Sequence, residues 1–152
     1  MRTAVLADTH GLLRASVLRR LVGFDAILHA GDVGKLEILD QLASIAPTYA
    51  VRGNVDHGLL AERLPASETV ECAGHLVHIV HDITMLDLDP RKAGLRLVVY
   101  GHSHQPHFEE KGGVAFLNPG SIGPRRFRLP IRFAALSWES TGFALEWIDL
   151  SD

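Results

Sequence analysis

The sequence predicts an α/β protein in which two β-sheets share one core and helices lie on the outside. Residues 3–51 alternate apolar strands with amphipathic helices, and this β-α-β-α-β series is typical of parallel strands joined by right-handed crossovers. Residues 68–150 change character, because their apolar runs are short and several are separated by turns that contain glycine. A length of 152 residues, with 47% hydrophobic and 22% charged residues, indicates one globular domain that covers residues 1–152.

Three buried strands are expected in the first third of the chain. Their apolar runs, which lack polar alternation, cover residues 3–7, 24–30 and 48–51. The connecting helices cover residues 12–22 and 36–46. Gly23 ends the first helix and Pro47 ends the second, since glycine favours helix C-termini and proline cannot continue a helix. All three strands should therefore end at the same edge of one sheet.

Short strands dominate the remainder of the chain. They are predicted at residues 68–72, 75–80, 95–100, 108–110, 114–117, 131–138 and 143–150. Turns at residues 73–74 and 111–113 pair neighbouring strands into hairpins. A short helical turn is predicted near residues 90–93. No linker or internal repeat divides the chain.

Side chains that bind metals follow five of the predicted strands. They are Asp8, His10, Asp32, Asn54, His81, His102 and His104. In an open α/β sheet, ligands bind just outside the carboxyl ends of the strands. Two carboxylates, one amide and four imidazoles suit Mn²⁺, Fe²⁺ or Zn²⁺, and seven donors exceed the need of one tetrahedral ion. Two ions with a bridging carboxylate would use them all. Asp8 and His10 lie two residues apart, so an extended backbone would project both to the same side.

The composition argues against several classes of protein. A formal net charge of −3, without a patch that interleaves basic and aromatic residues, argues against a nucleic-acid surface. No apolar segment is long enough for a secretory signal or a membrane span, so no membrane partner is expected. The single cysteine, Cys72, cannot form an internal disulfide, which predicts a cytoplasmic protein with this residue in its core.

Five motifs occur along the chain in order. They are Asp8-x-His10, Gly31-Asp32, Gly53-Asn54, His81 and Gly101-His102-x-His104. Together they resemble the calcineurin-like metallophosphoesterase family, and most of all its small single-domain YfcE-like phosphodiesterase branch. The segment Asn118-Pro119-Gly120-Ser121 is similar to a further signature of that branch. The resemblance implies the metallo-dependent phosphatase fold, in which two mixed β-sheets pack as a sandwich flanked by helices.

The same resemblance implies a role for each donor. Asp8, His10 and His104 would hold a first ion, Asn54, His81 and His102 a second, and Asp32 would bridge both. Mn²⁺ is favoured, with Fe, Zn or Ni as alternatives. Two ions about 3.5–4 Å apart would activate a bridging hydroxide for in-line attack on phosphorus. The implied activity is metal-dependent hydrolysis of a phosphoester, above all of a phosphodiester, with Asp32 and Asn54 in the catalytic set.

One departure from the family concerns the proton for the leaving group. Larger members carry a histidine directly after the Gly-Asn motif, where this chain has Val55, and this weakens the case for monoester hydrolysis. His57 is a candidate general acid, since Gly58 would let the loop turn back over the site. The alternative is a solvated loop residue. Asp56 would either orient the His57 imidazole or cap the following helical turn.

Several residues near the motifs have two interpretations each. Asp82 stands where the family usually has glycine, and it would either orient the preceding histidine or begin the loop. His29 would lie behind the bridging carboxylate or pack in the core. Arg125 and Arg126 would bind the substrate phosphate or belong to a solvated basic loop. Asn118 is expected to fix the turn near the metals.

Two functions fit the resemblance, an enzyme and a non-catalytic metal-binding scaffold engaged in protein–protein interaction. The complete set of donors favours the enzyme, because loss of His10, His81 or a carboxylate would favour the scaffold. The expected partner is a small phosphoester substrate. We also expect a homodimer, because Trp138, Phe143 and Trp147 add more apolar surface than a small core can hold.

Overall fold

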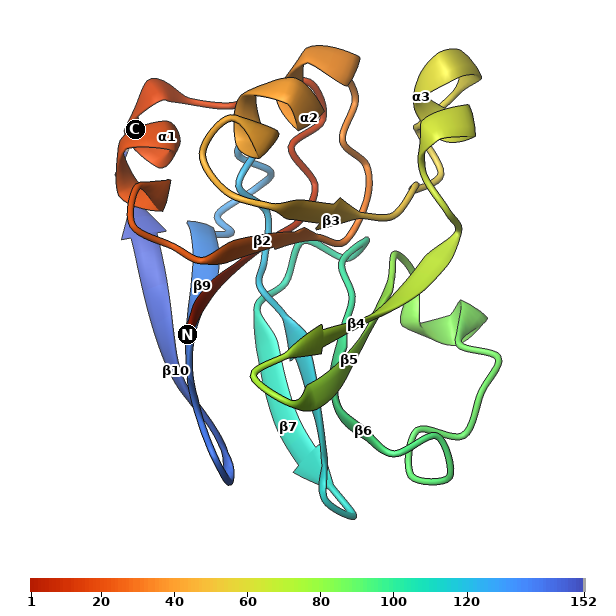
Figure 1. Cartoon of the computed structure of the whole chain (residues 1–152). Helices are drawn as coiled ribbons and strands as arrows, with labels where there is room; N and C mark the ends of the chain where they lie inside the picture. Colours follow the sequence, from red (N-terminus) through yellow and green to blue (C-terminus); the bar gives the residue numbers. More distant parts are fainter. Residues whose placement is uncertain (152) are drawn as a thin grey trace.

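The computed structural model describes residues 1–151, which form two five-stranded sheets packed face to face (Figure 1). The first sheet contains β1 (Arg2–Leu6), β2 (Ala26–His29), β3 (Thr48–Ala50), β9 (Ile131–Glu139) and β10 (Gly142–Leu150). The second contains β4 (Ser67–Cys72), β5 (His75–Val80), β6 (Leu95–Val99), β7 (His107–Lys111) and β8 (Val114–Asn118). The strand orders are β10-β9-β1-β2-β3 and β4-β5-β6-β8-β7.

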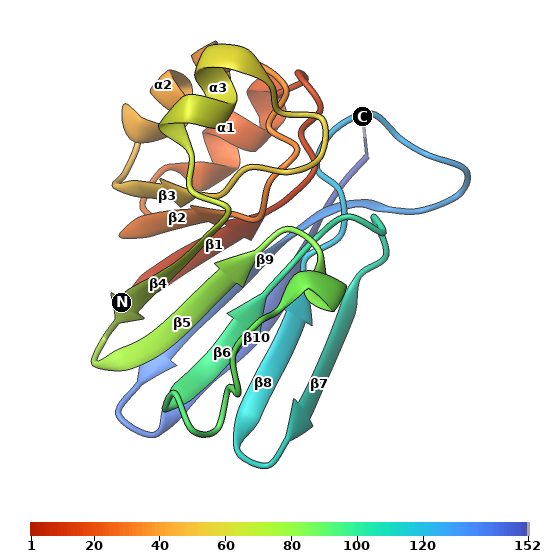
Figure 2. The same cartoon turned by 90° about the vertical axis from the view of Figure 1, so that its right-hand side faces the viewer.

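Short helices connect the strands. They are α1 (Ala15–Leu21), α2 (Leu36–Ala43), α3 (Gly58–Arg63) and the 3-10 helix η1 (Ile83–Met85). Figure 2 shows α1 and α2 on one side of β1, β2 and β3, with the second sheet on the other side. Among the residues that the structure describes, no helix has the length and apolar character needed to cross a lipid bilayer.

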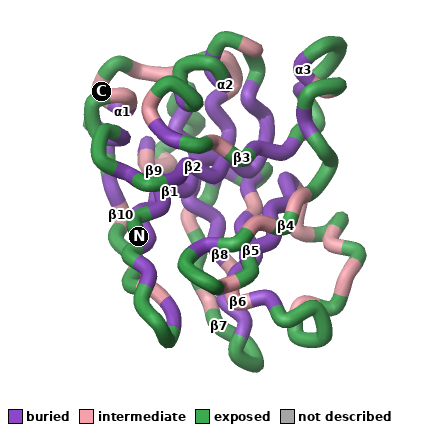
Figure 3. Tube along the Cα trace, viewed as in Figure 1, coloured by how far each residue is buried: buried purple, intermediate pink, exposed green. Residues whose placement is uncertain are grey.

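Burial on both faces explains the unbroken apolar run of β1. Ala4 and Leu6 pack into the core beneath the helices, whereas Val5 and Ala7 pack into the core between the two sheets. A strand that is covered on both faces has no position for a solvated polar side chain. Figure 3 shows the buried trace running through the centre of the molecule, while the hairpin turns are exposed.

The predicted fold class is confirmed, because both sheets contain parallel and antiparallel pairs and helices flank the sandwich. Some boundaries differ. The first helix begins at Ala15 rather than at residue 12, and Arg14 just before it uses its side chain to bind the carbonyls of Ile122 and Gly123. The turn near residues 90–93 is present, whereas η1 was not predicted.

The two sheets bring six strand ends together. β1, β2 and β3 run parallel to one another, and so do β5, β6 and β8. Backbone hydrogen bonds then join the loops that follow: Gly101 N donates to His81 O at 2.9 Å, and Ile122 N donates to Ala7 O at 3.2 Å. The polar strand ends of both sheets therefore meet at one end of the sandwich.

Candidate metal centre

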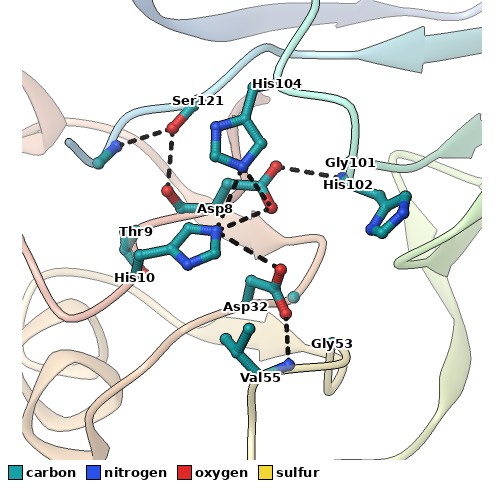
Figure 4. A network of polar contacts seen from close by, with 12 residues as sticks. Asp8, Thr9, His10, Asp32, Gly53, Val55, Gly101, His102, His104 and Ser121 are labelled. Atoms are coloured by element: carbon teal, nitrogen blue, oxygen red, sulfur yellow. Dashed lines mark hydrogen bonds and ion pairs between the residues drawn. The ribbon is translucent and has the colours of Figure 1, made fainter. Parts of the chain in front are cut away.

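The loops at this end of the sandwich gather the predicted donors into two groups. Asp8, His10 and His104 form the first, and Asp32, His81 and His102 form the second. In each group, one potential ligand atom per residue lies within 4.8 Å of the others. Figure 4 shows the side chains of Asp8, His10, Asp32 and His104 converging from the loops that follow β1, β2 and β6.

The first group contains a buried carboxylate oxygen without a hydrogen-bond donor. Asp8 Oδ1 makes no hydrogen bond to any described residue, although the side chain is fully buried. The Nε2 atoms of His10 and His104 each lie 3.6 Å from this oxygen and 3.2 Å from one another. A buried charge requires a partner of opposite charge, and these three atoms fit a divalent cation held between them.

In the second group, several hydrogen-bond acceptor atoms lie close to one another. His81 Nδ1 lies 2.8 Å from the Ala30 carbonyl, which can only accept, so Nδ1 carries the hydrogen. His81 Nε2 lies 3.1 Å from both Asp32 Oδ2 and Asn54 Oδ1. In the neutral ring Nε2 is also an acceptor, so the three atoms require either an extra proton or a cation among them. Their chemistry fits a second metal ion.

Asp32 lies between the two groups. Its Oδ2 is 3.5 Å from His10 Nε2 in the first group and 3.1 Å from His81 Nε2 in the second. Its Oδ1 accepts a hydrogen bond from Val55 N at 3.0 Å, which fixes the carboxylate plane. Burial favours the neutral acid, but hydrogen bonds from His81 and Val55 outweigh this and lower the pKa of Asp32.

The imidazoles of the two groups differ in their affinity for protons. Burial opposes charge on His81, yet its hydrogen bond and attraction to Asp32 raise the pKa of the ring. Burial lowers the pKa of His104, and the positive charge of Arg126 acts in the same direction. The lowered pKa favours a neutral His104 ring, which is the form that can bind a metal ion, whereas Asp32 favours positive charge on or beside His81.

Five of the seven donors adopt a left-handed backbone conformation. The φ values are 58° for Asp8, 47° for His10, 57° for Asp32, 74° for His102 and 63° for His104. Such residues are uncommon outside glycine and cluster at functional sites, where the surrounding fold holds them. The expectation that an extended backbone aims Asp8 and His10 is therefore wrong, because tight turns after β1 aim these side chains.

Glycines let the loops approach closely. A Cβ on Gly53 would lie 2.1 Å from Asp32 Oδ1, and a Cβ on Gly101 would lie 2.9 Å from Asp8 Oδ2. Both distances are shorter than real contacts, so a side chain at either position would displace a site carboxylate.

Asp56 is a structural residue of the site that the sequence analysis misassigned. Its buried carboxylate accepts hydrogen bonds from the backbone N–H groups of Val33, Gly34 and Gly53, and so ties the loop after β2 to the loop after β3. It neither orients His57 nor caps α3, and both expectations are wrong. Three backbone donors that converge on one acidic side chain leave no pattern in the sequence except an aspartate close to glycines.

Two more buried side chains support the loops. His29 Nδ1 accepts from Gly31 N at 3.1 Å, and His29 Nε2 lies 3.0 Å from the Thr9 hydroxyl. Asn118 Nδ2 donates to the carbonyl of Gly101, at the start of the loop that carries both histidines of that motif. Asn118 thus has the supporting position that we expected, and His29 lies behind the loops rather than among the donors.

The remaining predicted site residues lie at the periphery. His57 is exposed at the start of α3, and its role as an acid stays a prediction. Asp82 begins η1 by accepting from Thr84, while the Ala30 carbonyl orients His81, so Asp82 does not. Both Arg125 and Arg126 are exposed, and Arg125 lies 3.5 Å from a carbonyl of its own loop.

The aromatic residues are placed differently from our expectation. Trp138 is 7% exposed and donates from its indole N–H to the Thr3 hydroxyl, and Phe143 and Trp147 pack against the core between the sheets. Trp138 is therefore buried and the other two are partly buried, while the homodimer stays a prediction. In contrast, Phe127 is 92% exposed between two arginines, a short basic and aromatic segment that the sequence analysis missed.

Comparison with known proteins agrees with this geometry. Residues 1–141 match the model of the calcineurin-like phosphoesterase superfamily domain. A probable metallophosphoesterase of Methanothermobacter thermautotrophicus is 35% identical over 134 residues, which span 80% of this chain and 77% of the relative.

Solved structures share the fold. A structure described as a novel archaeal phosphodiesterase has a TM-score of 0.81 at 21% identity, covering 99% of this chain and 100% of its own. Vps29 from Entamoeba histolytica in complex with Zn²⁺ has a TM-score of 0.75 at 21% identity, covering 98% of this chain and 99% of its own. At these identities the likeness is one of fold. The family match and the sequence relative go further: the chain belongs to the calcineurin-like phosphoesterase superfamily.

Proposed function

We propose that this protein is a phosphodiesterase that uses two divalent metal ions. The observation that carries the proposal is the position of Asp32 Oδ2, which faces a ring nitrogen of each donor group at 3.5 and 3.1 Å. A carboxylate so placed would hold two ions at a fixed separation, as metal-dependent phosphoesterases require.

Each ion would have its own set of protein ligands. Asp8, His10 and His104 would hold one, and Asn54, His81 and His102 the other. When bound, the ions would lower the pKa of a water and offset the charge on the phosphate oxygens. Asp32 would hold both ions, and the Val55 N–H keeps its carboxylate in place. Arg126, whose charge acts on His104, is the candidate cation for the substrate phosphate.

We propose diesters rather than monoesters as substrates. The position after Asn54 is the exposed Val55, which cannot protonate a leaving group. A diester also carries less negative charge than a monoester. His57, in the same loop, would supply the proton to poor leaving groups, and Asp56 is not available to orient it because its carboxylate binds backbone N–H groups.

Mn²⁺ is our proposed metal, since the mixture of carboxylate, amide and imidazole donors suits a hard, expandable ion. The zinc complex of the Entamoeba histolytica Vps29 makes Zn²⁺ the first alternative. Fe and Ni are the others.

Turnover of two model substrates tests the proposal. Metal-free protein should be loaded in turn with Mn²⁺, Zn²⁺, Fe²⁺ and Ni²⁺, and then assayed with bis(p-nitrophenyl) phosphate and p-nitrophenyl phosphate. We expect a higher kcat/KM for the diester and the highest activity with Mn²⁺. A clear preference for the monoester would refute the substrate class. Tight binding of metal without turnover of either ester would favour the scaffold alternative.

A further inference from the structure

A cavity of about 370 Å³ opens beside the second group of donors. Asn54, His81 and His102 are among the residues that line it, so the cavity adjoins the candidate metal centre. Pockets for small molecules span roughly 300–1,000 Å³, and this cavity falls within that range. We call it the His81 pocket.

Part of the wall of the His81 pocket is apolar. It is formed by Ala66, Val80 and Met85. Val80 is buried, whereas Met85 is 71% exposed. A thioether packs favourably against aromatic rings, and covering an exposed methionine removes apolar surface from water. Together with the exposed imidazole of His102, this wall suits a flat, uncharged ring.

Two charged residues line the polar part of the pocket. Arg52 is held by its donor bond to the Leu64 carbonyl at 2.8 Å. Asp82 Oδ1 accepts from the backbone N–H and hydroxyl of Thr84, while Asp82 Oδ2 lies 3.9 Å from His102 Nε2. The carboxylate therefore has a fixed position with Oδ2 facing the His102 imidazole, and its negative charge would repel an anionic group.

We propose that the His81 pocket binds one ester group of the substrate through its flat, uncharged ring, and that Asp82 excludes ester groups that carry a negative charge. The ring is that of an aryl ester or the base of a nucleoside ester. This inference rests on the proposed function, because the phosphate must sit at the metal centre for an ester group to reach the pocket. The pocket would thus select among phosphodiesters by the shape and charge of one ester group.

Phosphonates test ring binding without turnover, because their carbon–phosphorus bond is not hydrolysed. Isothermal titration calorimetry of the Mn²⁺-loaded protein should show that phenylphosphonate binds about tenfold more tightly than methylphosphonate, from burial of the ring. Ala66→Trp, which fills the pocket, and Met85→Ala, which removes its wall, should each reduce this ratio. Ala144→Trp, on an exposed position of β10, is the matched control and should keep it.

A second pair of ligands and a second pair of variants test whether Asp82 excludes negatively charged ester groups. 4-Carboxyphenylphosphonate should bind about three- to tenfold more weakly than phenylphosphonate, because Asp82 repels the added carboxylate. Asp82→Asn should remove most of this difference, since asparagine can still accept from Thr84 but lacks the charge. Asp87→Asn, a nearby exposed position, should leave the difference unchanged. Thymidine 5′-monophosphate distinguishes the two sources of the ring. If the pocket binds a nucleobase, Ala66→Trp should weaken binding of thymidine 5′-monophosphate more than binding of phenylphosphonate. If the pocket binds an aryl ester, it should weaken binding of thymidine 5′-monophosphate less.

Equal affinities of the wild-type protein for phenylphosphonate and methylphosphonate would overturn the inference. An affinity ratio that is unchanged in both Ala66→Trp and Met85→Ala would overturn it as well. Turnover of bis(p-nitrophenyl) phosphate in the same preparation separates this outcome from failure of the proposed function. Turnover without ring preference would refute the pocket alone. Ring preference without turnover would refute the enzymatic proposal and retain the pocket as a ring-binding site.

Discussion

His29 provides a quantitative test of how the loops behind the site are held. The ring is fully buried, and Nδ1 accepts from the Gly31 N–H at 3.1 Å. The Thr9 hydroxyl donates to the Val33 carbonyl at 2.7 Å, so the 3.0 Å contact between Thr9 and His29 Nε2 places the ring hydrogen on Nε2. The neutral tautomer satisfies every partner. A second proton would remove the acceptor that the Gly31 N–H requires and would bury a charge.

Protonation of the buried His29 ring costs free energy, and the shift in its pKa sets the size of this cost. Burial lowers the pKa of His29 from 6.5 to about 4. In the unfolded chain the ring takes up its proton near pH 6.5, whereas the native ring does so only near pH 4. Between these values the unfolded state binds more protons, so the free energy of unfolding falls as the pH drops. At pH 4 the loss from this one group amounts to about 3 kcal/mol.

The substitution His29→Asn isolates this contribution. Asparagine can still accept from the Gly31 N–H, but it loses the Thr9 contact and does not titrate. At pH 7.5 we expect the variant to be about 1–2 kcal/mol less stable than the wild type, through the lost hydrogen bond and the space left by the ring. As the pH falls toward 4, the difference should shrink and then reverse, because only the wild type bears the protonation cost.

Urea unfolding of metal-free protein, followed by tryptophan fluorescence at pH 7.5, 6, 5 and 4, measures the difference. His107→Asn replaces an exposed histidine beside Glu109 and is the matched control. Its stability should follow the wild type at every pH. A difference between wild type and His29→Asn that stays constant from pH 7.5 to 4 would refute the assignment of His29 as a buried neutral ring.

Further substitutions test the donors and their loops. Asp32→Asn should lose at least one metal ion and most activity with an unchanged circular dichroism spectrum; full activity with both ions bound would show that Asp32 is not the bridge. Asp56→Asn should cost about 2–4 kcal/mol in urea unfolding, because an amide replaces a charged acceptor of three N–H groups, whereas the exposed Asp40→Asn should cost less than about 0.5 kcal/mol. A cost for Asp56→Asn no larger than for Asp40→Asn would contradict its loop-holding role. His57→Ala should barely affect p-nitrophenyl esters but slow alkyl esters about 10²–10⁴-fold. Equal, small effects on both would identify His57 as a solvated loop residue.

The sequence predicted the sheets and the location of the donors for a simple physical reason. Strands such as β1 are buried on both faces, so they appear as unbroken apolar runs, and the first polar residue after each run marks a strand end. Parallel topology then brings Asp8, Asp32 and Asn54 to one edge without knowledge of any contact. His81 likewise follows a predicted strand, residues 75–80, although this strand belongs to the other sheet.

Features that depend on tertiary contacts could not be predicted in this way. The left-handed conformations of Asp8 and Asp32 depend on the loops that pack around them. Asp56 accepts from backbone N–H groups, and backbone donors leave no trace in side-chain identity. Trp138 was expected to add exposed surface, but pairing of β9 with β1 covers its indole and gives it the Thr3 hydroxyl as a partner.

A crystal of the Mn²⁺-loaded protein, with anomalous scattering recorded at the manganese absorption edge, tests the central claim most directly. We predict two peaks per chain, one among Asp8, His10 and His104 and the other among Asn54, His81 and His102, with Asp32 Oδ2 contacting both. A single tetrahedral ion, with His81 and His102 not coordinated, would contradict the two-metal centre and the phosphodiesterase mechanism built on it.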